Sequence, residues 1–368
     1  MKITKVTPRL VEREMAGNLW NPRTRWTKKR MVLVFIETDT GHFGVGEGWT
    51  AGGSARALVD TIEDDLAPLL LGEDPHFVTR FGKLALETTE LSNRAGIIGA
   101  AFGAVDTALW DLIGKAAKLP LYRLLGAFDE QVLTYASAGL YGEGKGPDDL
   151  GAELRGYVEQ GFGAVKMKVG GAPLQEDVAR VAAAREAIGP DAKLMVDALY
   201  NLSVPEALAL ARAIEPYDIH FFEAPVSVHD VRGQAEVHAR SPIPVCGNET
   251  LAWTGPFREL ITQRAVHFVQ FDPAACGGIT EGRRIADLAH AFNLPCTLHA
   301  SSTSVLFAAC LHLGAALANC VSVEYHMLHQ WFWDLEPENT FLARDGFVRP
   351  PDGPGLGLAI TPDDVGEA

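Results

Sequence analysis

The chain has 368 residues, of which 47% are apolar and 21% charged, a composition typical of a globular protein with a large packed core. This length exceeds that of one small domain and fits two, one of which can be a barrel. The formal net charge is −15, with acidic residues spread along the chain, which argues against a nucleic-acid-binding surface. No apolar run predicts a membrane span, so we expect neither nucleic acid nor membrane as a partner.

The N-terminal segment MKITKVTPRLVERE alternates apolar and polar residues and lacks the apolar core of a signal peptide. The five cysteines are odd in number and fall on or near predicted core elements. They indicate reduced, buried thiols rather than a disulfide framework. These features predict a cytoplasmic protein.

The first part of the chain predicts an α+β module. Alternation predicts a strand over residues 2–13, and the runs MVLVFIETD and GHFGVGEGW predict a hairpin after the polar loop AGNLWNPRTRWTKKR. Helical patterns follow at residues 55–70, 76–89 and 96–119. Because strands are followed by helices without alternation, we expect a self-contained capping domain over residues 1–128.

From about residue 130 short apolar runs alternate with Ala/Leu/Glu/Arg-rich helical segments, a pattern typical of parallel strands joined by helical crossovers. No GxGxxG motif opens a helix after any of these runs, so a TIM-type barrel over residues 129–328 is favoured over an open Rossmann sheet. The Pro- and Gly-rich residues 329–368 are expected to pack back on the cap or the barrel mouth. The eight runs are residues 132–138, 164–170, 192–198, 219–225, 243–249, 265–272, 295–300 and 320–325.

Three acidic residues end the third, fourth and fifth of these runs. Asp197, Glu223 and Glu249 are equally spaced, since 223 − 197 = 26 and 249 − 223 = 26. On neighbouring parallel strands their carboxylates would converge and repel one another. A hard divalent cation relieves that repulsion, and ligation by oxygen alone suits Mg²⁺ better than Zn²⁺. We therefore predict one Mg²⁺ per subunit.

The other strand ends are polar as well. Lys166 and Lys168 lie two apart on the second run and point to the same face; their proximity should lower the pKa of one toward that of a useful base. Asp272 and His299 end the sixth and seventh runs, where a carboxylate would fix the imidazole tautomer and raise its basicity. Glu324 ends the eighth. Because barrel chemistry gathers at the C-terminal ends of strands, these residues predict one catalytic site.

The Lys-x-Lys pair, the Asp/Glu/Glu triplet and the later Asp, His and Glu resemble the mandelate racemase subgroup of the enolase superfamily. GVGEGW, DTALWDLIGKAAKLPLYRLLGA, GGIT and PGLG resemble that family too. The resemblance implies an α/β fold, a modified TIM barrel (β/α)7β with an N-terminal α+β capping domain. It also implies that Asp197, Glu223 and Glu249 hold the Mg²⁺.

The resemblance further implies a division of roles around a small-molecule carboxylate substrate. Lys168 and the His299–Asp272 dyad would face the α-carbon from opposite sides. Lys166 would neutralise charge on the substrate carboxylate, and Glu324 would hydrogen-bond its other oxygen.

The chain departs from the family pattern near Asp197. Many relatives place Asn two residues after the first metal ligand, whereas this chain has Leu199 there and Asn at position 201. The departure concerns the outer shell and the substrate contacts near Asp197 and leaves Asp197 as the implied ligand.

Residues that contact substrate are less clearly marked. A solvated basic loop explains the cap-loop arginines as well as substrate binding does. Turn geometry explains the glycines around Glu47, and packing in a loop is favoured for the histidines of HMLHQWFW, which include His329. The substrate-binding candidates are Trp20, Arg23, Arg25, Trp49, Asn201 and His326.

One opening step, removal of the proton α to a carboxylate to give an enediolate, permits three outcomes. Loss of the β-hydroxyl would convert an aldonate or aldarate to a 2-keto-3-deoxy acid, making the protein a carbon–oxygen lyase. Reprotonation on the other face by Lys168 or His299 would make it a racemase or epimerase of a 2-hydroxy or amino acid. Cycloisomerisation is disfavoured, because relatives that catalyse it usually carry lysine where this chain has Asp272.

Dehydration of an acid sugar is the commonest activity among relatives with this dyad, so we expect an Mg²⁺-dependent acid-sugar dehydratase that forms a homo-oligomer. A metal-binding homologue without catalysis is disfavoured, because the lysines and the dyad are all present.

Overall fold

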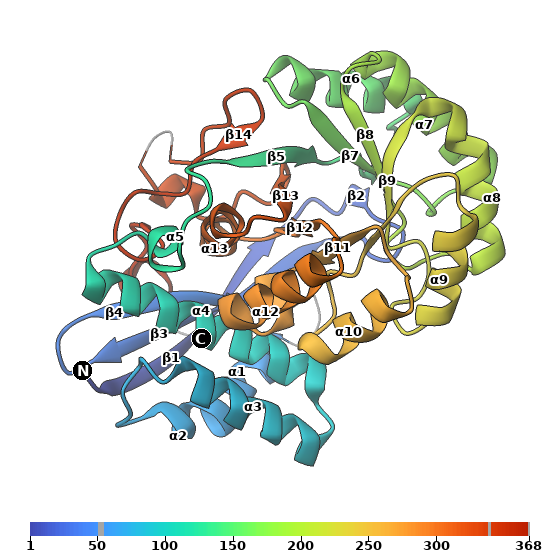
Figure 1. The fold of residues 1–368 in the computed structure, drawn as a ribbon. Coiled ribbons are helices and arrows are strands. Elements are labelled where there is room, and N and C mark those ends of the chain that lie inside the picture. The colour runs from blue at the N-terminus through green and yellow to red at the C-terminus, as the bar shows by residue number, and fades with distance from the viewer. Residues whose placement is uncertain (51–54, 338–339, 367–368) are drawn as a thin grey trace.

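The computed structural model describes residues 1–50, 55–337 and 340–366. A blue-to-cyan cap of one antiparallel sheet and several helices lies against a parallel barrel wrapped by helices (Figure 1).

The barrel consists of eight strands, and every neighbouring pair within it is parallel. The last strand also pairs with the first, which closes the sheet. Each predicted apolar run coincides with one strand to within a few residues, so the predicted barrel is confirmed. The strands are β5 (Val132–Ser137), β7 (Ala164–Lys168), β8 (Lys193–Asp197), β9 (Ile219–Glu223), β10 (Val245–Gly247), β11 (Phe268–Phe271), β12 (Cys296–Leu298) and β13 (Cys320–His326).

Seven principal crossover helices join these strands in the described part of the chain, which gives the (β/α)7β order. The start of α8 shows how the sequence sets a boundary: Ser203 accepts from the backbone N–H of Glu206, whose side chain accepts from the Ser203 N–H. The helices are α6 (Pro147–Glu159), α7 (Leu174–Ile188), α8 (Val204–Ile214), α9 (Val231–Arg240), α10 (Thr254–Thr262), α12 (Gly278–Ala291) and α13 (Ser304–Ala316), with a short α11 (Pro273–Cys276) before α12.

The cap contains the predicted hairpin and helices. Its sheet has the order β1 (Ile3–Glu14), β3 (Lys28–Thr38), β4 (Phe43–Gly48), all antiparallel. The predicted helix at 55–70 includes a π-helical segment, so the run is continuous but not uniform. The helices are α1 (Ala55–Asp60), η1 (Thr61–Leu66), α2 (Ala67–Leu70), α3 (Val78–Ser92), α4 (Ala95–Ala117) and α5 (Leu121–Leu124).

The GVGEGW segment belongs to a strand, so turn geometry does not account for its glycines. A Cβ added to Gly46 would lie 2.0 Å from the Ala104 carbonyl oxygen, and one added to Gly44 would lie 2.0 Å from that of Ala108. Glycine at alternate positions therefore lets α4 pack directly on the backbone of β4. The opposite face of β4 carries Val45, which packs with the barrel core.

Helix α4 corrects the expectation that no apolar segment reaches membrane-spanning length. It is long and apolar enough by composition, yet 83% of its most apolar window is buried inside the protein. Its two acids have partners: Asp106 accepts from Thr280, and Asp111 accepts from the backbone of Val45 and Leu356. The helix packs between the cap sheet and the barrel as a core element.

The C-terminal segment touches both parts of the fold. Its short strand β14 (Phe347–Val348) pairs antiparallel with the start of β5. Farther on, the Leu121 N–H donates to the Gly355 carbonyl at 2.8 Å, and the Leu356 N–H donates to Asp111 at 2.8 Å. The segment therefore contacts both the barrel and helix α4, while the division into domains after residues 128 and 328 stays a prediction.

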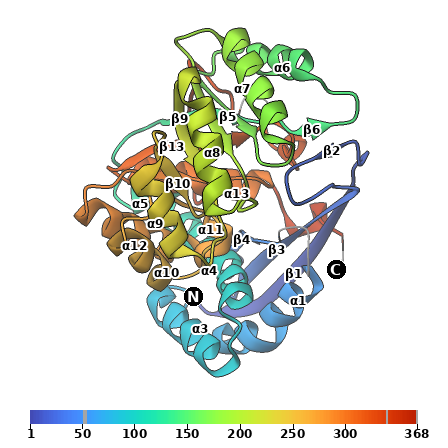
Figure 2. The same cartoon turned by 90° about the vertical axis from the view of Figure 1, so that its right-hand side faces the viewer.

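The cap loop reaches the barrel mouth through two residues that sequence patterns did not mark as a strand. β2 (Leu19–Trp20) pairs antiparallel with β6 (Tyr141–Gly142), which follows β5. Figure 2 shows β2 beside β6, far from the cap helices α1 and α3. The five cysteines are free thiols, four of them buried.

Candidate active site

The C-terminal strand ends bring the predicted charged residues together under the barrel mouth. Lys166 is fully buried, with its Nζ 2.7 Å from Glu223 Oε2 and 3.0 Å from Glu324 Oε1. Burial alone would lower the pKa of Lys166, but these two carboxylates raise it well above its ordinary value. The proximity of Lys166 and Lys168 was expected to lower the pKa of one of them. For Lys166 the two carboxylates outweigh the effect of the neighbouring lysine.

Lys168 forms an ion pair with Asp197 on the adjacent strand, where the two residues are direct β-sheet partners. The other Asp197 oxygen accepts from the Leu199 N–H at 2.8 Å. Burial opposes ionisation of Asp197, but Lys168 and Lys166 together lower its pKa.

The other two predicted metal ligands are also buried. Asp197 and Glu223 are partners across β8 and β9, and Glu249 follows β10. Burial and the nearby Asp197 carboxylate raise the pKa of Glu223 to about 8. Its Oε1 is buried without a hydrogen-bond partner among the described residues. An orphaned oxygen in a cluster of mutually repelling carboxylates is the donor set that a hard cation suits.

The carboxylates are nonetheless directed to other partners. Lys168 holds Asp197, Lys166 holds Glu223, and the Tyr200 hydroxyl donates to Glu249 Oε2 at 2.5 Å. Within residues 1–50, 55–337 and 340–366, no three His, Cys, Asp or Glu side chains converge as a ready-made metal site. The residues fit Mg²⁺ by chemistry and by position on consecutive strands, and holding it would require these side chains to leave their present partners.

His299 and Asp272 form the predicted dyad. The His299 Nδ1 lies 2.7 Å from Asp272 Oδ2, and the second Asp272 oxygen accepts from the Ala274 N–H at 2.7 Å. The His299 Nε2 lies 3.3 Å from Glu324 Oε2. Burial opposes the charged imidazole, but Glu324 and Asp272 raise the pKa of His299 to about 9. The imidazolium is therefore the form favoured at neutral pH.

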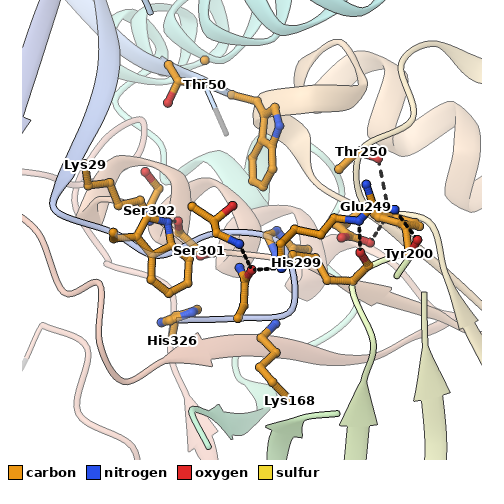
Figure 3. Close-up of a pocket in the computed structure, with 17 residues that line it drawn as sticks. Lys29, Thr50, Lys168, Tyr200, Glu249, Thr250, His299, Ser301, Ser302 and His326 are labelled. Carbon is orange, nitrogen blue, oxygen red and sulfur yellow. Dashed lines mark hydrogen bonds between the residues drawn. The ribbon is translucent and has the colours of Figure 1, made fainter. Parts of the chain in front are cut away.

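A cavity of about 240 Å³ opens above these residues. Lys168, Glu249 and His299 reach its surface. Figure 3 shows Lys168 and His299 between Glu249 on one side and Lys29 on the other. The other charged residues at the strand ends are buried and do not line the cavity. They are Lys166, Asp197, Glu223, Asp272 and Glu324.

Three of the six substrate-binding candidates line this cavity. Arg23 donates to the Leu199 carbonyl at 2.8 Å and to that of Tyr200, so the cap loop is anchored at the barrel mouth. Trp49 meets the His299 ring edge-to-face at 5.4 Å. His326 lines the cavity and stacks at 4.2 Å on His329, which is buried outside the lining.

The other three candidates lie outside the lining. Trp20 stacks on Tyr141, and Arg25 lies over the Trp20 ring while pairing with Glu143. Asn201 is exposed and donates to the Gly170 carbonyl at 2.8 Å. The pairing of β2 with β6 places Trp20 and Arg25 at the barrel rim. Asn201 is instead held by its hydrogen bond to Gly170. Glu47, two residues before Trp49, accepts from the backbone of Thr303 and Leu306 at the start of α13.

Sequence reasoning missed several residues that line the cavity, among them Lys29 and Tyr200. Alternation along β3 gives a signal for Lys29, since Leu33 and Phe35 on the same side of the strand pack with the barrel core. No comparable signal marks Tyr200, because Leu199 and Tyr200 adopt φ values of 46° and 61°, which non-glycine residues seldom adopt.

Comparisons with known proteins identify the family of the chain. A family model described as enolase C-terminal domain-like matches residues 149–365, and the mandelate racemase/muconate lactonizing enzyme N-terminal domain matches residues 9–126. The chain is 36% identical over 330 residues to the arabinonate dehydratase of Saccharolobus solfataricus, covering 90% of this chain and 88% of the relative. It is 32% identical to the D-galactarolactone cycloisomerase of Agrobacterium fabrum, covering 100% and 98%.

A solved structure of a racemase from Streptomyces coelicolor with bound magnesium matches with a TM-score of 0.90 and 29% identity, covering 99% of this chain and 98% of that one. The family models span both the cap and the barrel, and the relatives match over nearly their whole length. The chain therefore belongs to the enolase superfamily, in the family of mandelate racemase and muconate lactonizing enzyme.

Proposed function

We propose that the protein is an Mg²⁺-dependent dehydratase of an acid sugar, a hydro-lyase that converts an aldonate or aldarate to a 2-keto-3-deoxy acid. The observation that carries the proposal is the Asp272–His299 pair, of which His299 lines the cavity that Lys168 also reaches. The relative named arabinonate dehydratase supports the same reaction class.

Lys168 acts as the base in this scheme. Its amine takes the proton from the α-carbon, which requires that it first release Asp197 and become neutral. His299 acts as the acid, because a protonated imidazole held by Asp272 can donate its Nε2 proton to a departing β-hydroxyl. The C–O bond breaks as the hydroxyl leaves as water, and the resulting enol becomes the 2-keto acid.

Mg²⁺, held by Asp197, Glu223 and Glu249, would offset the negative charge that develops on the substrate carboxylate. Lys166 supplies a fixed positive charge beneath that carboxylate, because Glu223 and Glu324 keep it protonated. Glu324 holds both Lys166 and His299 in place through its two oxygens.

The test is incubation with Mg²⁺ and a panel of mono- and diacid sugars in D₂O. We expect at least one of these acids to give a 2-keto acid and to exchange its α-proton for deuterium. His299→Asn should lower dehydration by about 10²–10⁴-fold while α-exchange by Lys168 persists on substrates presenting that face. His290→Asn, an exposed position on α12, is the matched control. Absence of both keto acid and exchange across the panel would overturn the proposal and favour an inert metal-binding homologue.

Two other reactions share the opening proton transfer. Epimerisation would use Lys168 and His299 on opposite faces and would give solvent deuterium in both epimers without keto acid. Cycloisomerisation was disfavoured because Asp272 replaces the usual lysine, but the cycloisomerase relative matches the entire chain and makes it the second candidate. Including sugar-acid lactones in the panel distinguishes it, since ring opening yields a keto acid without net loss of water.

The cytoplasmic location and the homo-oligomeric assembly belong to the same proposal. Size-exclusion chromatography with light scattering measures the assembly.

A further inference from the structure

The cavity has two chemically different ends. In Figure 3 Tyr200 and Glu249 lie on one side, Lys29, Ser302 and His326 lie on the other, and Lys168 and His299 lie between them. A substrate whose reacting carboxylate is held at the Glu249 end therefore extends past the catalytic pair toward Lys29.

Lys29 is a buried cation whose hydrogen bonds are incomplete. Its side chain reaches the cavity from β3, and its Nζ donates to the Ser301 carbonyl at 2.7 Å. An ammonium group has three donors, and this is the one hydrogen bond that Lys29 Nζ makes with the described residues. No carboxylate of the described chain lies within 4.0 Å of it, although Glu47, Glu324 and Asp272 act on it from farther away.

The burial of Lys29 carries an electrostatic cost. Loss of water around the ammonium lowers the pKa of Lys29 to about 7, in spite of those three carboxylates. An anion entering the cavity would restore the charged form and complete its donors, since buried charges are held in proteins by paired, hydrogen-bonded partners.

Neighbouring side chains at this end add neutral donors. The Leu328 N–H donates to His326 Nδ1 at 3.3 Å, so a neutral His326 carries its proton on Nε2. Burial lowers the pKa of His326 well below its ordinary value and keeps the ring neutral. Ser301 and Ser302 also line this end. One cation surrounded by neutral donors matches a single carboxylate.

We propose that Lys29 binds the second carboxylate of a diacid sugar, which makes the protein selective for aldarates over aldonates. This assignment rests on the proposed function and names the substrate class for it. The alternative is that Lys29 only ties the cap to the loop that follows His299, through Ser301. A tie of that kind would affect monoacids and diacids alike.

The experiment measures kcat/KM for matched aldarate and aldonate pairs of the same configuration, among them galactarate and galactonate, in wild type and Lys29→Gln. We expect wild type to prefer the aldarate. Loss of the cation should reduce the aldarate/aldonate ratio by roughly 100-fold, as expected for removing one partner of a buried charge pair. Lys28→Gln is the matched control, because Lys28 pairs with Glu12 and Glu14 on the surface of the cap.

A ratio in Lys29→Gln within about threefold of wild type, at the scale that uncharged contacts contribute, overturns the assignment. Wild-type preference for aldonates does the same while leaving the proposed function intact. Absence of α-exchange with every acid sugar overturns both. If Lys29→Gln does not fold, Lys29→Met keeps the apolar stem and takes its place, and the wild-type preference needs no variant.

Discussion

Each charged residue in the floor of the cavity depends on its neighbours for its protonation state. Glu324 is shared: one oxygen lies 3.0 Å from Lys166 and the other 3.3 Å from His299. Both cations lower the pKa of Glu324 far below its usual range, against the effect of burial. Since removing one partner of a buried ion pair leaves an uncompensated charge, loss of one member changes the charge of the others.

Replacing His299 by Asn should change how the stability of the metal-free protein depends on pH. The pKa of His299 is about 9 in the folded protein against an ordinary value of 6.5. Proton binding therefore stabilises the fold fully below about pH 6.5, and this stabilisation is lost as the pH rises through about 9. It amounts to at most about 3 kcal/mol.

Urea unfolding in EDTA at about pH 6 and about pH 9.5 measures this effect. The free-energy difference between wild type and His299→Asn should be larger at the lower pH, and His290→Asn should show no such trend. A difference that stays constant or grows with pH would mean that His299 is not protonated preferentially in the folded state.

The strand-end residues were predictable because one rule places them. Apolar runs give the strands, and the C-terminal ends of parallel barrel strands must converge. Lys166, Asp197 and Glu223 therefore fall together without any knowledge of loops. Lys29 and Tyr200 do not follow that rule, because one depends on how the cap docks and the other on a turn with unusual backbone angles.

At the level of elements, the cap is held by a helix and a strand that approach through glycine. The Gly44, Gly46 and Gly48 side of β4 faces α4, where Ala104 and Ala108 lie one turn apart. The other side of β4 meets the barrel through Val45 and Glu47. Strand β4 therefore contacts α4 on one side and the start of α13 on the other.

Gly46→Ala should destabilise the protein even though alanine is a small residue. Its Cβ would lie 2.0 Å from the Ala104 carbonyl oxygen and 2.7 Å from the Ala108 nitrogen. Both are backbone atoms of a long helix and cannot rotate away, so we expect a loss of about 3 kcal/mol or more in the free energy of unfolding.

Gly156→Ala is the matched control for that measurement. Gly156 lies within α6, and a Cβ there would meet nothing within 4 Å. Alanine should stabilise this helix by up to about 1 kcal/mol. Equal effects of the two substitutions in urea unfolding would contradict the role given to the β4–α4 contact.

The elements that escaped prediction are the shortest ones. β2, β6 and β14 have two residues each, and two residues carry no periodicity. Their pairing is set by where the cap loop and the C-terminal segment meet the barrel. For the same reason the sequence could not tell that Trp20 and Arg25 turn to the rim while Arg23 turns to the cavity.

Across the whole molecule, cap and barrel meet at the mouth through contacts beside the predicted catalytic residues. The Trp49 N–H donates to the Ala274 carbonyl at 2.9 Å, close to Asp272, and Lys29 donates to Ser301, close to His299. Arg23 holds the turn that presents Tyr200 to Glu249. Placement of the cap therefore bears directly on the side chains that would hold substrate.

Magnesium should stabilise the folded protein measurably, independent of catalysis. Burial and repulsion from Asp197 raise the pKa of Glu223 to about 8, and a bound cation offsets that repulsion. A ligand present at about 100 times its Kd, and bound only by the folded state, stabilises that state by about 2.7 kcal/mol. Mg²⁺ should therefore raise the melting temperature by several degrees, and EDTA should reverse the rise.

Asp197→Asn should abolish most of this rise in melting temperature, whereas Asp191→Asn, at an exposed position before β8, should keep it. An undiminished rise in Asp197→Asn, followed by differential scanning fluorimetry, would place the cation elsewhere and remove this triplet from the mechanism.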